Sequence, residues 1–441
     1  MKKLLSIILI MGYNILSAQG GSTILINNVQ IFNGKEEKTT IGNVLIIDNI
    51  ITKISSSPIP INKSGNTKII DGKGKFLMPG LIDVHMHLIM SACTQEELMA
   101  PGVTMDFINE KAKIEAKGLL MRGYTSIRDV GGPVFDMKRQ IDAKKTEGPR
   151  IYPSGGMISQ TSGHGDFRLP SEKSRRFGGQ ISHGELMGFG FIADGRDEVL
   201  TATRENLRSG ATQIKLMAGG GAATVYDPLD VAQYTLDELK AAVEAADDWG
   251  TYVTVHAYTP KAVKRAIEAG VKCIEHGQLL DEESMKILAD KGIWLSLQAL
   301  DEAPATQPKD IREKKHKVVQ GTANAFTWAK KYNIKLAFGT DYMFNPTGNK
   351  NQNKDYLKLK DFLTPFEILK MATHDNAQLL TLSGERNPYK EGKLGVIEEG
   401  AYADMILVDG NPLQNLDLVG NPEKNFVVII KDGVVYKNTL K

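Results

Sequence analysis

Short apolar runs alternate with helical patterns through the middle of the chain, and this alternation is the strongest constraint on its fold. Strands buried on both faces appear as continuous apolar runs, and strands that alternate with helices form parallel sheets. Eight runs fit this description: 81–88, 124–130, 150–155, 213–218, 251–257, 273–277, 294–298 and 335–341. Because eight βα units close a barrel, the sequence predicts an α/β fold with a (β/α)8 TIM-like barrel over residues 81–389. An open doubly wound sheet is disfavoured, since no GxGxxG motif follows an early strand.

The two ends of the chain follow a different pattern. Residues 20–80 and 390–441 alternate apolar and polar side chains, which is typical of strands with one solvent-facing side. Asn33-Gly34 and Asp432-Gly433 are hairpin signals. We therefore predict a small β-sandwich domain to which both terminal segments contribute.

Two polar segments interrupt the barrel pattern. Residues 157–212 are too many for a single connection and include polar, Gly-rich sequence before a predicted helix at 197–210. Residues 345–355 directly follow the last predicted strand. Long connections usually carry recognition functions. We expect both segments to be loops over the mouth of the barrel.

The net charge of the chain indicates which kind of binding partner to expect. The chain has 441 residues, with 54 Lys and Arg against 52 Asp and Glu, which gives a net charge of +2. Binding to nucleic acid needs a concentrated excess of positive charge, so we expect a small-molecule substrate and no nucleic-acid partner. Cys93 and Cys273 are too few for a disulfide scaffold and are expected to be free, buried thiols.

The first 19 residues resemble a targeting segment. Lys2 and Lys3 precede an apolar run from Leu4 to Met11, and the small pair Ser17-Ala18 lies near a cleavage point. A short membrane anchor is the alternative, but the run falls well below the roughly 20 apolar residues of a spanning helix. Residues 1–19 are therefore predicted to be a signal peptide, which implies an exported protein, periplasmic or secreted, with no stable membrane anchor.

Ionisable side chains recur at the carboxyl ends of the predicted barrel strands, where barrel enzymes place their active sites. His85 and His87 are two residues apart and so project from the same face of one strand. The full set of metal-ligand candidates is His85, His87, Lys215, His256, His276 and Asp341. Four imidazoles and a carboxylate suit a divalent cation, with zinc as the first choice.

Lys215 is the exception in this set, because an ammonium group would repel a metal ion. It must be deprotonated, or converted by carbon dioxide into a carbamate, an anionic group that can bridge two metal ions. Among the other polar residues, Arg128 and Asp129 are interpreted as a structural ion pair under the site. The charged run 311–317, which includes His316, is interpreted as a solvated helix face, and His183 and His374 have no ligand spacing.

The residue pattern resembles the metal-dependent amidohydrolase superfamily. An HxH on strand one, Lys on strand four, His on strands five and six and Asp on strand eight carry the resemblance, which spans residues from about 23 to 437 and includes the two-ended β-sandwich. The motifs PGLIDVHMHL, TSIRDVGG, SGHGD, QIKLMAGGG, VHAYT, IEHG and FGTD are similar to one branch of that superfamily. This branch contains Xaa-Pro and Xaa-Arg dipeptidases, related carboxypeptidases, ochratoxin-type amidases and, more distantly, imidazolonepropionases.

The resemblance implies a role for each candidate. His85 and His87 would bind one metal ion, His256 and His276 the other, and carboxylated Lys215 would bridge them. Two metal ions would lower the pKa of a bridging water to give a hydroxide nucleophile and polarise the scissile carbonyl. Asp341 would complete the site and act as general base, then general acid. His164 and Tyr258 would contact the substrate.

The predicted function is therefore hydrolysis of an amide bond in a dipeptide or an N-acyl amino acid by an exported binuclear metallohydrolase. Hydrolysis of a cyclic amide, as in imidazolonepropionase, is the alternative activity, although that branch generally lacks the bridging lysine. A non-catalytic metal- or solute-binding protein on the same scaffold is the third reading. The family resemblance leaves a homo-oligomer open.

Overall fold

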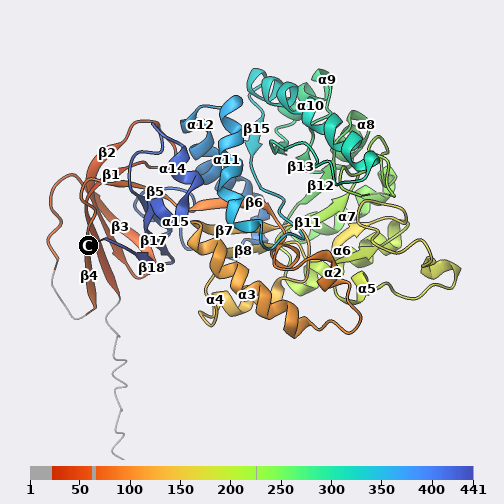
Figure 1. Cartoon of the computed structure of the whole chain (residues 1–441), viewed down its shortest axis with the longest axis horizontal. Coiled ribbons are helices and arrows are strands. Elements are labelled where there is room, and N and C mark those ends of the chain that lie inside the picture. The colour runs from red at the N-terminus through yellow and green to blue at the C-terminus, as the bar shows by residue number, and fades with distance from the viewer. Residues whose placement is uncertain (1–21, 62–65, 225, 441) are drawn as a thin grey trace, which may run out of the picture.

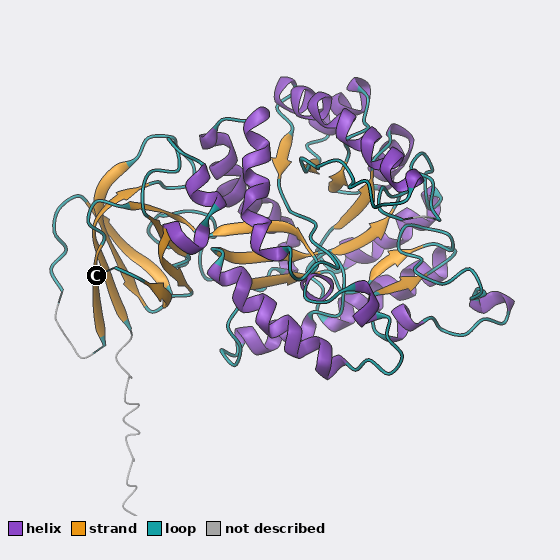
Figure 2. Cartoon of the chain, in the orientation of Figure 1, coloured by secondary structure: helices purple, strands orange, loops and turns teal. Residues whose placement is uncertain are grey.

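The structure is a computed structural model that describes residues 22–61, 66–224 and 226–440. Figure 1 shows two parts: a sheet at one end of the molecule, where strands from both terminal segments lie side by side, and a larger α/β body. In Figure 2 the helices of the larger body lie around the outside of its strands. This is the predicted fold class, a TIM-like barrel with a small terminal β-structure. The predicted signal peptide, residues 1–19, lies outside the described residues.

Each of the eight predicted runs contains a strand of the larger body. Their pairing is parallel throughout, as βα units require. The strands are β6 (Leu81–Met86), β7 (Tyr124–Asp129), β8 (Arg150–Pro153), β11 (Ile214–Met217), β12 (Val253–Ala257), β13 (Cys273–His276), β14 (Trp294–Ser296) and β15 (Lys335–Ala337).

Together with β9 (Met157–Ser159) and β10 (Gly190–Ile192), these strands form two hydrogen-bonded sheets, β6-β7-β8 and β10-β9-β11-β12-β13-β14-β15, which meet at two seams. At one seam the Thr212 amide donates to the Pro153 carbonyl at 2.8 Å. At the other the Val84 amide donates to Phe338 at 3.4 Å, and the Asp341 amide donates to His85 at 2.8 Å. The seams bring the first and last barrel strands together, so residues about 250 positions apart in the sequence share one mouth.

Amphipathic helices cover the strands because each buries one apolar stripe. The long helices are α3 (Met105–Met121), α4 (Phe135–Asp142), α6 (Arg196–Ser209), α7 (Leu236–Asp248), α8 (Pro260–Ala269), α9 (Glu282–Asp290) and α10 (Lys309–Lys331). Shorter ones are α1 (Leu88–Ser91), α2 (Gln95–Leu98), α5 (His183–Leu186), α11 (Asp355–Lys358), α12 (Pro365–Lys370), α13 (Asn376–Leu380), α14 (Asp417–Gly420) and α15 (Pro422–Asn425). Local sequence sets their starts, as at Thr235, whose side chain forms a capping box with Glu238.

The terminal sheet has eight strands in the described residues, drawn from both terminal segments. They are β1 (Thr23–Ile31), β2 (Thr40–Ile47), β3 (Ile50–Ser55), β4 (Thr67–Asp71), β5 (Phe76–Pro79), β16 (Met405–Val408), β17 (Phe426–Lys431) and β18 (Val434–Asn438). A bulge at Asn28, whose φ is 54°, divides β1, so its first half pairs with β4 and its last residues pair with β5. Side chains from β1, β2, β16 and β17 pack in one core, which gives the sheet the character of a sandwich.

Arg150 joins the barrel to the terminal sheet. This buried side chain on β8 lies 3.1 Å from the carboxylate of Asp404 and 2.6 Å from that of Asp432, and its guanidinium packs 4.0 Å from the centre of the Tyr402 ring. Buried charges are tolerated when they are paired in this way. The contact fixes the C-terminal strands against the barrel.

The structure corrects both loop predictions. Residues 157–212 contain the predicted helix as α6, but they also include two added strands, β9 (Met157–Ser159) and β10 (Gly190–Ile192), so the segment extends the barrel sheet. Residues 345–355 include a 3₁₀ helix, Asn349–Lys354, in which Gln352 is buried and donates to Asp83 at 2.9 Å. The polar composition of residues 345–355 suggested an exposed loop, but amide side chains of this segment are buried and form hydrogen bonds with other buried groups.

The remaining structural predictions concern thiols and membrane segments. Cys93 and Cys273 are free and buried, as predicted. In the part of the chain that the structure describes, no helix is both long and apolar enough to cross a bilayer.

Candidate metal centre and active site

The six ligand candidates meet at the mouth of the barrel. His85, Lys215, His256 and His276 lie on β6, β11, β12 and β13, and His87 directly follows β6. Asp341 lies beyond the end of β15, not at the end of a strand as predicted. The carboxyl ends of parallel strands point to the same side of a barrel, so the order of the fold brings these residues together.

Three of them form a compact group that could hold a metal ion. Ligand atoms of His85, His276 and Asp341 all lie within 4.8 Å of one another. Oδ1 of Asp341 lies 3.4 Å from Nε2 of His85 and 3.4 Å from Nε2 of His87. This oxygen is buried and no hydrogen bond from the described residues satisfies it, which fits an atom reserved for a cation.

His256 lies next to this group but its ligand atoms are not part of it. Its ring centre lies 4.5 Å from that of His276, and the ring centres of His85 and His276 are 5.0 Å apart. The structure therefore brings all four imidazoles into one cluster but places only two of them, with Asp341, within mutual ligating distance.

Each of the four imidazoles has one ring nitrogen next to an oxygen acceptor. The nitrogen–oxygen distances are 2.8 Å for His85 and Glu275, 3.2 Å for His87 and the Gly131 carbonyl, 3.1 Å for His256 and the Gly220 carbonyl, and 2.9 Å for His276 and Gln298. Metal-binding histidines almost always donate their second ring N–H in this way, because the bond fixes the tautomer and orients the ring. The donor set therefore fits a metal centre.

Burial also favours the neutral form of these imidazoles, which is the form that binds a cation. It lowers the pKa of His85 to about 4 and that of His276 to about 3. Both rings are therefore neutral near pH 7, the state that binds a metal. Burial would raise the pKa of Asp341, but the surrounding imidazoles outweigh it and hold this pKa well below its ordinary value, so Asp341 is ionised.

Lys215 lies inside the same cluster. Its side chain is 1% exposed, and its Nζ lies 3.4 Å from Nε2 of His85. Burial lowers the pKa of the amine, because the charged form loses its hydration. Burial beside an imidazole therefore favours the neutral form of the Lys215 amine, which is a nucleophile.

Unusual backbone geometry aims two of the ligands. His276 has a φ of 78° and Asp341 a φ of 57°, in the left-handed region that residues with a Cβ rarely adopt. Gly339 makes this path possible, since a Cβ there would lie 2.1 Å from the backbone nitrogen of His85. The strain is located at the ligands themselves.

The sequence analysis missed Glu275. Its buried carboxylate lies 2.6 Å from Arg128 and 2.8 Å from Nδ1 of His85, and it also accepts a hydrogen bond from Thr254. Arg128 therefore pairs with Glu275 and not with Asp129, which corrects the predicted ion pair. The signal that could have identified Glu275 is a carboxylate inside an apolar strand, next to the ligand His276.

The two predicted substrate contacts lie against the histidine cluster. The ring of His164 stacks on that of His256 with centres 4.0 Å apart, and its Nδ1 lies 3.0 Å from the buried Asp227. The ring of Tyr258 stacks on that of His276 at 4.9 Å. Burial raises the pKa of Tyr258 far above its usual range, so its hydroxyl remains a donor.

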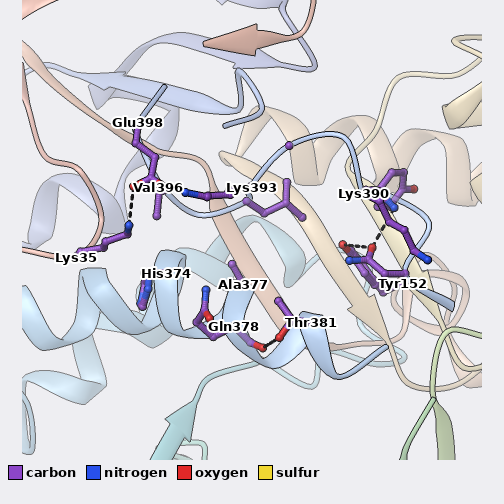
Figure 3. A pocket seen from close by; sticks show the side chains of 14 residues that line it. Lys35, Tyr152, His374, Ala377, Gln378, Thr381, Lys390, Lys393, Val396 and Glu398 are labelled. Carbon is purple, nitrogen blue, oxygen red and sulfur yellow. Dashed lines mark hydrogen bonds and ion pairs between the residues drawn. The ribbon is translucent and has the colours of Figure 1, made fainter. Parts of the chain in front are cut away.

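The other histidines lie elsewhere. Nε2 of His183 lies 2.9 Å from the Leu98 carbonyl, and His316 pairs with Glu302 on the surface. His374 lines a separate cavity of about 500 Å³ below the loop 387–398, shown in Figure 3. There Lys35 and Lys393 both pair with Glu398, so each lysine already has an anionic partner.

Comparison with known proteins decides the family. The model of the amidohydrolase family matches residues 76–438. The chain belongs to the amidohydrolase family. It is 32% identical to the ochratoxinase of Aspergillus niger over 374 residues, which are 82% of this chain and 75% of the relative.

Two solved structures are also similar to this amidohydrolase. A prolidase in complex with N-methylphosphonate-L-proline has a TM-score of 0.84 and 29% identity, over 95% of this chain and 100% of that one. A Xaa-Pro dipeptidase with bound methionine in its active site has a TM-score of 0.80 and 28% identity, over the same shares. The amidohydrolase is therefore a hydrolase that acts on carbon–nitrogen bonds, in a family that generally uses divalent metal ions.

The buried contact between Glu275 and His85 generates a prediction about metal affinity. Glu275→Gln places an amide beside Nδ1 of His85 and removes the charge opposite Arg128. The proton of His85 would then favour Nε2, the nitrogen that faces Asp341. Changes of this kind typically cost 10- to 100-fold in metal affinity, measurable by competition with a chromophoric chelator.

The matched control is Glu268→Gln, an exposed glutamate on α8. It should leave metal affinity unchanged. Equal affinities in the Glu275→Gln variant and the wild-type protein would contradict the role assigned to this carboxylate.

Proposed function

We propose that this amidohydrolase cleaves the amide bond of dipeptides or N-acyl amino acids at a binuclear metal centre. The observation that carries the proposal is the buried Lys215 amine among four imidazoles and the Asp341 carboxylate. The similarity to a prolidase and to a Xaa-Pro dipeptidase supports the same substrate class.

Lys215 supplies the bridging ligand in this proposal. Its neutral amine attacks carbon dioxide, an N–C bond forms, and one proton is released, which leaves a carbamate anion at the former Nζ. The buried location favours the neutral amine that this step needs. With this group, His85 and His87 would hold one metal ion, and His256 and His276 would hold the other.

Two divalent cations, for which zinc fits the ligand set, would supply an activated water and polarise the scissile carbonyl. Asp341 is the residue of this chain that transfers the proton. As an ionised carboxylate at the mouth it accepts a proton from the attacking water, and it then donates that proton to the leaving nitrogen. The products are a carboxylate and an amine.

Tyr258 and His164 orient the substrate. The Tyr258 hydroxyl keeps its proton and can donate to a carbonyl or carboxylate oxygen. Asp227 accepts a hydrogen bond from Nδ1 of His164, which fixes the ring against His256. Both side chains therefore lie against the ring of a predicted metal ligand.

The cyclic-amide activity remains the alternative, and a substrate panel separates the two. We expect the metal-loaded enzyme to hydrolyse dipeptides or N-acyl amino acids and not an imidazolone ring. Asp341→Asn removes the proton acceptor, so kcat should fall by about 10²- to 10⁴-fold, while Asp290→Asn on the exposed end of α9 should not change it.

Lys215→Ala belongs to the same panel. It should lower the metal content from two equivalents per chain to one or none and abolish turnover. Hydrolysis of the imidazolone alone would establish the alternative activity, and full activity of either active-site variant would contradict the mechanism.

We also propose that the enzyme is exported and that residues 1–19 are removed. The support is the charged start, the apolar run and the small residues of that segment. Intact-mass measurement of protein from its native host should give a chain that lacks these residues, found in the periplasm or the medium. A cytosolic protein that retains Met1 would exclude export.

A further inference from the structure

One face of α10 lies at the mouth of the barrel. The buried positions Ile311, Val318 and Thr322 recur at helical spacing, and Lys315 falls on the same stripe. Val318 is fully buried in a cluster with Ala222, Leu229 and Tyr258. The first half of α10 therefore packs against the predicted substrate-binding tyrosine, and the interpretation of 311–317 as a solvated face is wrong for this stripe.

The neighbouring Lys314 holds the helix in place. Its Nζ donates to the carbonyls of Thr224 at 2.8 Å and Asp227 at 2.7 Å. Asp227 in turn contacts His164. Lys314 therefore has a structural role, and it fixes the position of Lys315 relative to the active-site mouth.

Lys315 itself has no such partner. It is half-buried, and no ion pair or hydrogen bond to it occurs within the described residues. The charged groups that act on it are Asp341, Lys358, Asp301 and Asp355. Lys358 already pairs with both other carboxylates, at 2.5 Å to Asp301 and 2.8 Å to Asp355.

A half-buried ammonium without a counter-ion is costly, and it indicates an anionic ligand. Burial lowers the pKa of Lys315, and a bound anion would reverse that effect. Asp341 is ionised and near enough to act on this amine, but no contact joins them. Lys315 therefore lacks an anionic partner among the described residues, on the helix that borders the active-site mouth.

We propose that Lys315 binds the free carboxylate of the amino acid on the leaving side of the scissile amide. In a dipeptide or an N-acyl amino acid, one carbon atom separates this carboxylate from the leaving nitrogen. A residue that binds the carboxylate must therefore lie near Asp341 and Tyr258. Lys315 lies one helical turn before Val318, which packs in one cluster with Tyr258. This inference rests on the proposed function and makes Lys315 the residue that selects α-carboxylate substrates.

Matched acid and amide substrates test the inference. N-acetyl-L-proline and N-acetyl-L-phenylalanine are compared with their carboxamides, which have the same scissile bond but no carboxylate. A hydrogen-bonded charge pair is typically worth about 10- to 100-fold, so the wild-type enzyme should prefer the acids by that factor in kcat/KM. Lys315→Met should remove the preference through KM, and Lys315→Arg should retain most of it.

Lys317→Met is the control, because Lys317 lies exposed on the same helix and has no ion pair among the described residues. It should keep the wild-type preference. An acid preference that survives in Lys315→Met overturns the inference and assigns Lys315 to internal charge balance. Lys315→Gln replaces the methionine variant if that variant does not fold.

Equilibrium binding separates failure of this inference from failure of the proposed function. Calorimetric titration of metal-loaded protein with the same acids and amides needs no turnover. If the wild-type protein hydrolyses neither these four compounds nor the dipeptides of the substrate panel, the proposed function fails. The binding preference for acids, and its loss in Lys315→Met, then still decides the role of Lys315.

Discussion

The buried chain Arg128–Glu275–His85 is the interaction on which the active-site mouth depends. It places a guanidinium and a carboxylate, both without exposed surface, beneath an imidazole that faces Asp341 and Lys215. Burying charge is costly unless every group is paired. Because Glu275 satisfies Arg128 and His85 together, the barrel can hold a cluster of polar side chains where an apolar core would otherwise continue.

The barrel converts this local arrangement into a catalytic site. Parallel strands end at one mouth, and the seam between β6 and the segment after β15 places Asp341 beside His85. The end of β13 and the turn after β15 carry the added constraints: the left-handed backbone at His276 and Asp341, and the close approach at Gly339. Helix α10 and the loop around Asp227 then form the side of the mouth where the substrate binds in our proposal.

The sequence predicted the barrel strands well, because buried parallel strands need apolar runs. A polar residue inside such a run is conspicuous, and this made the ligand candidates visible. The sequence analysis placed Asp341 at a strand end, whereas β15 ends at Ala337 and an irregular turn supplies the aspartate. Glu275 was missed because ligand spacing says nothing about the groups that orient a ligand. Lys315 was not predicted because it lies in a charged run. Only the packing of α10 shows which lysines of that run face the protein and which face solvent.

The central claim is that Lys215 carries a carbamate between two metal ions, and anomalous X-ray diffraction from zinc-loaded crystals tests it most directly. The account predicts two zinc peaks about 3.5–4 Å apart, with electron density for a carboxylate group continuing beyond Nζ of Lys215 and bridging both ions. A single zinc peak, or an unmodified Lys215 side chain next to the ions, would contradict it.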